Sequence, residues 1–332
     1  MKRVLSQSSK QSSAPASGPP AGGERRQLAY LSHPSSLLHD MGEGHPECPA
    51  RVSAVRNALR EAGLMDEMDC LEAPAATYAQ MLRAHPSAHL RRLEHASPAS
   101  GTAHLDGDTS MNEHSLTAAI HAAGAMVHAV ELVTGGGYQR AFCNVRPPGH
   151  HAESSTPMGF CLINSVAVGA MHALEARGLE RVAIIDFDVH HGNGTEEILA
   201  AEPRVMMAST FQSPLYPGSG ETPLGPNMVN VGLPPGSDGQ ALRRAVEDQW
   251  WPALTEFKPQ LLLISAGFDA HQDDPLAQLN WTEQDYAWVT HKLSALANMC
   301  CEGRIVSTLE GGYALPALGR SAVAHVRALI GH

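Results

Sequence analysis

Cysteine is scarce in this sequence. It has six cysteines in 332 residues, and no two of them form a Cys-x-x-Cys pair. A cysteine-ligated structural zinc and a disulfide framework are therefore not expected. The first residues also lack the charged, apolar and small-residue segments of a signal peptide, so we expect free thiols in a reducing, cytoplasmic environment.

A basic surface and a long apolar run are missing as well. Lys and Arg number 23 against 34 Asp and Glu, a net charge of −11, whereas a protein that coats nucleic acid is normally basic. No apolar run approaches the roughly 20 residues of a membrane-spanning helix. We therefore expect no direct nucleic-acid partner and no membrane. Hydrophobic residues make up 43% and charged residues 17% of the chain, which excludes a fully disordered protein.

The N-terminal segment differs in composition from the rest of the chain. Residues 1–27 are rich in Ser, Ala, Pro and Gly, which predicts a disordered low-complexity tail. Residues 28–332 contain no second linker, so we interpret them as one globular domain.

Short apolar runs alternate with helical periodicity along this domain. The predicted strands are 28–31, 141–145, 182–185, 205–208, 261–264 and 305–309. The predicted helices are 51–62, 115–133, 163–177, 194–201, 239–256 and 283–302. Continuous apolar strands that alternate with helices are typical of an α/β domain, in which a central parallel sheet carries helices on both faces.

Polar residues follow four of the predicted strands. These segments are 146–151, 186–194, 265–269 and 310–313, and they are rich in His, Asp and Gly. The carboxyl ends of parallel strands share one edge of the sheet, where α/β proteins bind their ligands. The four segments are therefore expected to meet at one rim. The chain has 19 histidines, and we interpret most of those outside these segments as surface or core residues.

Asp188, His190 and Asp269 make a candidate metal site. Asp188 and His190 are two residues apart, so their side chains point to the same side of an extended chain, and Asp269 follows another strand. Three protein ligands with one open position are typical of a catalytic zinc, although iron(II) or cobalt fits the same ligands. Two carboxylates neutralise a divalent ion, so other groups must help to activate water.

His150, His151 and Tyr313 can supply that help. The two imidazoles offer a general base and a second imidazole beside it. Tyr313, which follows Gly311 and Gly312, offers a hydrogen-bond donor to a developing oxyanion. Activated water, a base and such a donor together predict hydrolysis of an amide or an ester.

Six ordered segments resemble the zinc-dependent histone deacetylase family, most closely its class II branch and the bacterial histone deacetylase-like amidohydrolases. They are RPPGHHAE at 146–153, MGFCLIN at 158–164, DFDVHHGNGT at 186–195, YPGSG at 216–220, SAGFDA at 265–270 and EGGY at 310–313. The resemblance runs from about residue 30 to the C-terminus. It implies a single arginase-like α/β catalytic domain over 28–332 that holds one zinc ion.

The resemblance also implies a role for each matching residue. The implied zinc ligands are Asp188, His190 and Asp269. The implied catalytic residues are His151 as general base, His150 as its electrostatic partner, Asp186 as the carboxylate beside the first His, Asn193 as the partner of the base, and Tyr313 as the group that polarises the carbonyl. Because the amide of Asn193 is neutral, His151 is expected to be a weaker base than in members that have Asp there.

A tunnel for an aliphatic chain and a second ion are implied as well. The tunnel residues are Gly159, Phe160, Tyr216 and Leu276, with Tyr216 where many members have Phe. Aromatic walls suit the butyl chain of an acyl-lysine. A structural K⁺ is implied at Asp186, Ser209 and Thr210. Apart from the resemblance, Asp106 and Asp108 either hold the substrate backbone at the rim or belong to a solvated turn.

The predicted reaction is removal of acetyl or other acyl groups from lysine side chains of a peptide or protein. One alternative is hydrolysis of small acylated amines such as acetylpolyamines, and another is a non-catalytic acyl-lysine reader. The intact histidine pair and Tyr313 argue against the reader. Leu276 stands where polyamine-selective members of the family have Glu, which favours the acyl-lysine substrate.

Overall fold

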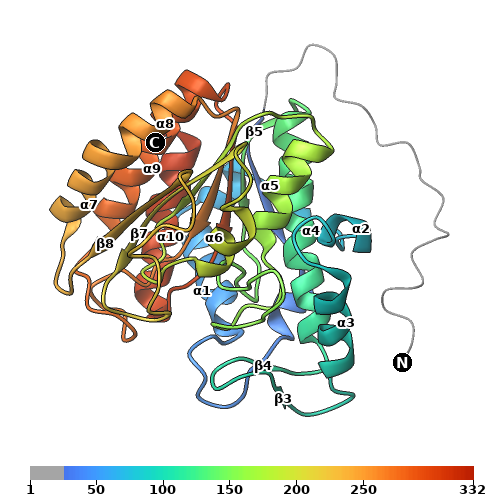
Figure 1. The fold of residues 1–332 in the computed structure, drawn as a ribbon. Helices are drawn as coiled ribbons and strands as arrows, with labels where there is room; N and C mark the ends of the chain where they lie inside the picture. The colour runs from blue at the N-terminus through green and yellow to red at the C-terminus, as the bar shows by residue number, and fades with distance from the viewer. Residues whose placement is uncertain (1–25) are drawn as a thin grey trace.

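A computed structural model of the chain describes residues 26–332 (Figure 1). Residues 1–25 of the predicted tail lie outside the described residues. The first strand, β1, begins at Arg26, so regular structure starts two residues before the predicted domain boundary at residue 28.

Eight parallel strands form the central sheet, in the order β2-β1-β5-β10-β9-β6-β7-β8. Their bounds are β1 (Arg26–Ser32), β2 (Asp69–Glu72), β5 (Tyr138–Cys143), β6 (Val182–Asp186), β7 (Val205–Gln212), β8 (Met228–Leu233), β9 (Leu261–Ala266) and β10 (Ile305–Leu309). The remaining two strands, β3 (Ala103–His104) and β4 (Ser110–Met111), form a separate antiparallel pair. The predicted α/β class with a parallel sheet is confirmed.

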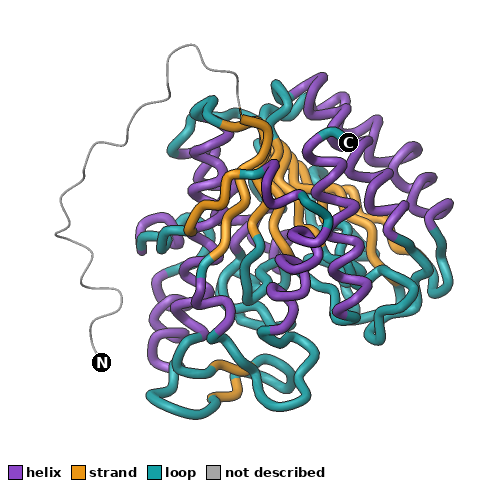
Figure 2. The backbone as a smooth tube through the Cα atoms, turned by 180° about the vertical axis from the view of Figure 1, so that it is seen from behind, coloured by secondary structure: helices purple, strands orange, loops and turns teal. Residues whose placement is uncertain are grey.

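Helices cover both faces of this sheet (Figure 1 and Figure 2). One face carries α2 (Tyr78–Met81), α3 (Ser87–Ala96), α4 (Ser115–Thr134), α5 (Ser165–Glu175) and α6 (Asn193–Leu199). The other carries α1 (Ala50–Glu61), α7 (Gly239–Ala245), α8 (Trp251–Phe257), α9 (Glu283–Cys300) and α10 (Leu315–Ile330). Two short 3-10 helices, η1 (Pro34–Leu37) and η2 (Leu64–Glu67), follow β1 and α1, and a π-helical segment, η3 (Val246–Trp250), joins α7 to α8.

The strands are apolar throughout because each side of the sheet faces a hydrophobic core. In β9, Leu261 and Leu263 pack into the core under α4 and α5, while Leu262 and Ile264 pack into the core under α9 and α10. All four side chains are 0% exposed. This two-sided burial produces continuous apolar runs in the central strands, whereas a half-exposed strand would alternate apolar and polar residues.

The predicted elements lie close to the observed ones, and β10 has the bounds predicted for it. The edge strands β2 and β8 are not among the predicted strands, because several of their residues are partly exposed and interrupt the apolar run. The predicted helix 239–256 consists of α7, η3 and α8 in succession. The C-terminal helix α10 is also absent from the prediction.

Helix α4 is longer and more apolar than the sequence led us to expect of any segment. The helix has 20 residues, and an 18-residue window of it has a mean hydropathy of 1.5, which meets the length and composition of a membrane span. Of that window, 72% is buried inside the protein. The sequence disguises this because Ser, Thr and His interrupt the apolar residues. The helix packs on α5 and β5, as expected for a core helix.

Candidate active site

The four polar segments meet at one edge of the sheet, as predicted. They follow β5, β6, β9 and β10, and these strands occupy the middle of the sheet. The loops after their carboxyl ends gather at the lower edge of the molecule in Figure 2. Segments that are more than a hundred residues apart in sequence therefore contribute to one site.

Asp188, His190 and Asp269 converge at this edge. Their candidate ligand atoms lie within 4.8 Å of one another. His190 Nδ1 is 3.1 Å from Asp188 Oδ1 and 3.2 Å from Asp269 Oδ2. Backbone groups orient the other two oxygens: Gly311 N donates to Asp188 Oδ2 at 2.8 Å, and Val189 N donates to Asp269 Oδ1 at 2.9 Å. The group is thus preorganised and could hold one metal ion.

Two glycines bring the backbone directly against these carboxylates. A Cβ at Gly267 would lie 2.0 Å from Asp188 Oδ2, and a Cβ at Gly311 would lie 2.0 Å from Asp269 Oδ2. Carbon and oxygen atoms cannot approach this closely without bonding. Any larger residue at either position would therefore displace a candidate ligand.

The charges around His190 favour a cation at this point. Burial lowers the pKa of His190, but the adjacent carboxylates of Asp188 and Asp269 outweigh burial and raise the pKa to about 10. Burial, together with the charge of Asp188, raises the pKa of Asp269 to about 6. A divalent ion on these ligands would displace the proton that His190 holds between the two carboxylates.

His150 is a charged neighbour of this group. Its Nδ1 lies 3.0 Å from Asp186 Oδ2, and its Nε2 lies 3.8 Å from Asp188 Oδ1. Burial alone would lower the pKa of His150, but the two carboxylates hold it well above its ordinary value. His150 is therefore an imidazolium at neutral pH.

His151 is held as a neutral imidazole. Its Nδ1 lies 2.8 Å from Asn193 Oδ1, while Asn193 Nδ2 donates to Glu153 Oε1 at 3.1 Å. An amide oxygen only accepts, so His151 Nδ1 carries the hydrogen and Nε2 is free to take a proton. Burial and the charges of His150 and His190 hold the pKa of His151 well below its ordinary value.

Tyr313 is positioned from two sides. Asp274 Oδ2 accepts from Tyr313 N at 2.7 Å and from Ala314 N at 3.2 Å, and its Oδ1 accepts from Leu276 N at 3.1 Å. The Arg51 guanidinium lies 4.9 Å from the centre of the Tyr313 ring. Burial raises the pKa of Tyr313 well above its ordinary value, although Arg51 opposes the shift. The phenol therefore remains a hydrogen-bond donor.

A buried charge cluster holds Arg51 in place. Glu47 pairs with Arg51 at 3.0 Å and with Arg146 at 2.6 Å, and Arg51 Nε donates to Gly312 O at 2.7 Å. Burial alone would raise the pKa of Glu47, but Arg146 and His39 hold it well below its ordinary value. The cluster ties the start of α1 to the Gly-Gly-Tyr turn.

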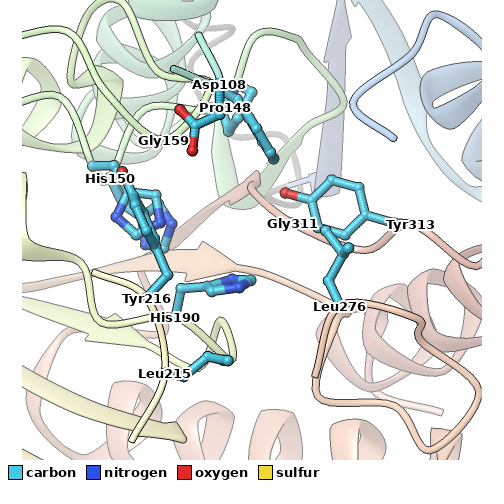
Figure 3. A pocket seen from close by; sticks show the side chains of 12 residues that line it. Asp108, Pro148, His150, Gly159, His190, Leu215, Tyr216, Leu276, Gly311 and Tyr313 are labelled. Atoms are coloured by element: carbon cyan, nitrogen blue, oxygen red, sulfur yellow. The ribbon is translucent and has the colours of Figure 1, made fainter. Parts of the chain in front are cut away.

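A pocket of about 200 Å³ opens above His190 (Figure 3). In Figure 3, Tyr313 and Leu276 lie on one side of it, and His150 and Tyr216 lie on the opposite side. Its lining residues are Asp108, Pro148, His150, His151, Gly159, Phe160, His190, Leu215, Tyr216, Leu276, Gly311 and Tyr313.

The Gly159–Phe160 segment shapes one wall of this pocket. A Cβ at Gly159 would lie 2.5 Å from the His151 ring, so glycine is needed for the close approach. Phe160 adopts φ 67°, a left-handed conformation that is unusual for a bulky residue. Its ring meets Tyr313 edge-on with centroids 6.0 Å apart. This local strain serves to aim an aromatic side chain into the pocket.

The family profile described as "Histone deacetylase domain" matches residues 45–329. The chain belongs to the histone deacetylase family. It is 37% identical to a "Probable deacetylase" of Archaeoglobus fulgidus, over 85% of this chain and 80% of that protein. It is also 37% identical to "Histone deacetylase 14, chloroplastic" of Arabidopsis thaliana, over 90% of this chain and 75% of that protein.

A solved structure of the HDA15 HD domain has the same fold as this histone deacetylase family member. The TM-score is 0.86 at 33% identity, and the match covers 92% of this chain and 90% of that one. The arginase-like fold that the motifs imply is therefore confirmed. The family and its relatives make this chain a hydrolase of the deacetylase class.

Several residues of the histone deacetylase motifs line the pocket. All four predicted tunnel residues line the pocket, and Asp108 lines it too, whereas Asp106 does not. Asp186 and Ser209 face each other in register across β6 and β7. Thr210 Oγ1 is buried and has no hydrogen-bond partner within residues 26–332. A K⁺ ion at these residues stays a prediction.

The sequence motifs assign no role to three buried acids that support the histone deacetylase site: Asp274, Glu47 and Glu310. Glu310 Oε2 accepts from Gly149 N at 2.7 Å and from His150 N at 3.2 Å. A buried acid is uncommon and needs partners, but burial is not visible in the sequence. One signal was present, since Glu310 follows directly on the apolar strand β10.

Proposed function

We propose that this protein is a zinc-dependent amidohydrolase that removes acetyl or related acyl groups from lysine side chains. One observation carries the proposal: a single pocket is lined by His190 of the candidate metal group, by a neutral imidazole, His151, and by a phenol donor, Tyr313. Hydrolysis of an amide uses all three groups. An acyl-lysine reader would need none of them.

The candidate ligands fit zinc in number and chemistry. Asp269 Oδ2 is buried and accepts no well-formed hydrogen bond from the described residues, so a cation would satisfy it. Two carboxylate oxygens and the Nδ1 of His190 leave a position for water or substrate, as in catalytic zinc sites. When bound, zinc would polarise the acyl carbonyl and lower the pKa of a water molecule.

The protein's own groups manage protons and charge in this proposal. His151 Nε2 takes a proton from the attacking water and later returns it to the leaving amine. His150, as an imidazolium, stabilises the negative charge that develops beside it. Tyr313 donates a hydrogen bond to the oxyanion that forms from the acyl carbonyl. The rings of Phe160 and Tyr216 contact the aliphatic stem of the substrate and exclude water.

The lining of the pocket supports the acyl-lysine substrate. Leu276 presents an apolar side chain there, and the Asp108 carboxylate can accept backbone N–H groups of a peptide. Asp108 is also the observation that favours the alternative, because the same carboxylate could attract the remote ammonium of an acetylpolyamine. We favour the peptide because Leu276 adds no second charge. The proposed compartment is the cytoplasm, and the net charge of −11 supports a partner other than nucleic acid.

A substrate panel tests this proposal. Purified zinc-loaded protein is assayed with acetyl-, propionyl- and butyryl-lysine peptides and with acetylspermidine and acetylputrescine, and a hydroxamate is added as a two-oxygen chelator. We expect higher kcat/KM for the peptides and inhibition by the hydroxamate. Hydrolysis restricted to the polyamines would overturn the substrate assignment, and full activity after complete metal removal would overturn the mechanism.

A further inference from the structure

Residues 213–227, which join β7 to β8 and are called the Tyr216 loop below, carry one wall of the active-site pocket. Tyr216 lies on the side of the pocket opposite Tyr313 (Figure 3). Its ring meets the His151 ring edge-on with centroids 5.2 Å apart, and the His190 ring with centroids 6.3 Å apart. Tyr216 is 37% exposed, so contacts elsewhere in the loop must hold it in this position.

Glu196, on helix α6, is bonded to this loop at two points. Its Oε1 accepts a hydrogen bond from Leu224 N at 3.0 Å and another from Asn230 Nδ2 at 2.8 Å. The same amide group of Asn230, on β8, also donates to Gly220 O at 3.0 Å. Because Gly220 is four residues beyond Tyr216, these bonds fix the loop backbone on the C-terminal side of the aromatic residue.

The second carboxylate oxygen of Glu196 orients a ring on which the loop packs. Glu196 Oε2 lies 2.7 Å from His191 Nε2. A carboxylate only accepts, so His191 Nε2 carries the hydrogen and the ring is held in one orientation. A Cβ at Gly220 would lie 2.6 Å from the His191 ring. The main chain at Gly220 therefore packs directly on a ring that Glu196 holds.

Burial and charge suit Glu196 to this task. The residue is 2% exposed. Burial alone would raise its pKa, but the hydrogen bonds from His191, Leu224 N and Asn230 outweigh burial and lower the pKa of Glu196. An ionised carboxylate accepts stronger hydrogen bonds than a neutral group does. Glu196 does not line the pocket, so it can act on a substrate only through the loop.

We propose that Glu196 is a positioning residue that sets the affinity of this enzyme for the aliphatic stem of its substrate. It holds Gly220 and Leu224, and the loop between β7 and β8 thereby keeps the Tyr216 ring at the pocket wall. The inference rests on the proposed function, in which Tyr216 contacts that stem. The stem is the same in the ground state and in the transition state, so a displaced Tyr216 should raise KM and leave kcat nearly unchanged.

Two hydroxamates separate binding of the stem from binding of the metal. Octanohydroxamate carries an alkyl chain, whereas acetohydroxamate carries only a methyl group, and both chelate through the same two oxygens. Their affinities for the zinc-loaded full chain are measured by calorimetry. In Glu196→Ala we expect octanohydroxamate to bind tenfold or more weakly and acetohydroxamate to change less than twofold. An equal loss for both ligands, or no loss for either, would overturn the proposal.

Further variants separate positioning from a general loss of structure. Glu196→Gln keeps an oxygen for Leu224 N and Asn230 Nδ2 and should restore the octanohydroxamate affinity to within about threefold of the unmodified protein. If Glu196→Ala does not fold, Asn230→Ala removes only the bridge to Gly220 O and should weaken octanohydroxamate threefold or more; unchanged binding would then overturn the proposal.

Glu197→Gln is the matched control. Glu197 is the next residue on α6, is exposed, and accepts from Ser154 N and Oγ rather than from the Tyr216 loop. This variant should change neither hydroxamate affinity. A loss in Glu197→Gln as large as that in Glu196→Ala would show a general effect of charge removal on α6 and overturn the proposal.

A double variant ties the effect to the aromatic wall. In a Tyr216→Ala background there is no ring to position, so Glu196→Ala should change octanohydroxamate affinity less than twofold. A full tenfold loss in that background would show that Glu196 acts elsewhere and overturn the proposal. With an acetyl-lysine peptide, Glu196→Ala should raise KM about tenfold and keep kcat within threefold. If the unmodified protein does not hydrolyse the peptide, the proposed function fails, while the hydroxamate affinities still decide the role of Glu196.

Discussion

Replacing Asn193 with Asp would put a carboxylate where an amide oxygen now lies 2.8 Å from His151 Nδ1. At present burial and the charges of His150 and His190 hold the pKa of His151 well below its ordinary value. A carboxylate favours the protonated ring. The base form of His151 would then be lost at a higher pH, so the acidic limb of the kcat/KM profile should move to higher pH.

The size of this shift follows from the geometry. Two unit charges about 4 Å apart interact by about 4 kcal/mol at an effective dielectric constant of about 20, which equals about 3 pKa units. Asn193→Asp alone should produce only part of this pKa shift. Asn193 Nδ2 now donates to Glu153 Oε1 at 3.1 Å, so the new carboxylate would lose that contact and be repelled by Glu153. We expect about 1 unit for Asn193→Asp alone and about 2 units when Glu153→Gln is added.

The assay is kcat/KM for an acetyl-lysine peptide between pH 5 and 9, with metal content measured at each end of the range. Glu153→Gln alone is the matched control and should leave the acidic limb within a few tenths of a unit. An unchanged acidic limb in the double variant, with metal retained, would show that His151 is not the base.

Four further outcomes are expected. Tyr313→Phe should lower kcat about 100- to 1,000-fold at unchanged metal content, because it removes one oxyanion donor; an unchanged kcat would contradict the assigned role. Asp188→Ala or Asp269→Ala should reduce metal from about one ion per chain to near zero, as read by elemental analysis. Leu276→Glu should raise the ratio of kcat/KM for acetylspermidine over acetyl-lysine peptide about fivefold or more, since about 1 kcal/mol is gained across solvent at about 4 Å; an unchanged ratio would remove Leu276 from the specificity argument. Asp274→Asn should lower kcat about 10- to 100-fold with little change in KM, because a charged acceptor of the Tyr313 N–H is lost. A loss of kcat that is accompanied by a large fall in melting temperature would instead indicate a purely structural role.

The central strands could be predicted because burial on both faces leaves uninterrupted apolar runs, as in Leu261–Ala266. The edge strand Asp69–Glu72 could not, because half of its residues are exposed and its sequence resembles a loop. Helix Gly239–Ala245 continues into the π-helical segment Val246–Trp250. A π-helix has i→i+5 hydrogen bonds and a wider turn than an α-helix, so a pattern with a period of 3.6 residues does not predict it.

The candidate site could be predicted as far as its groups lie within short motifs. Asp188 and His190 share one loop. The supporting contacts join distant positions: Asp274 reaches Tyr313 across 39 residues, and Glu47 reaches Arg146 across 99. No local pattern marks such pairs, because the partner of a buried charge is decided by tertiary packing.

Gly267 and Gly311 restrict which substitutions the candidate metal site can accept. At Gly267 and Gly311 the main chain itself touches the candidate ligands, so no side chain can be inserted there to tune them. Selection for another metal, whether in evolution or in the laboratory, would have to replace Asp188, His190 or Asp269 themselves, or residues that line the pocket. Libraries built around residues 267 and 311 should therefore yield inactive, metal-poor protein rather than altered metal preference.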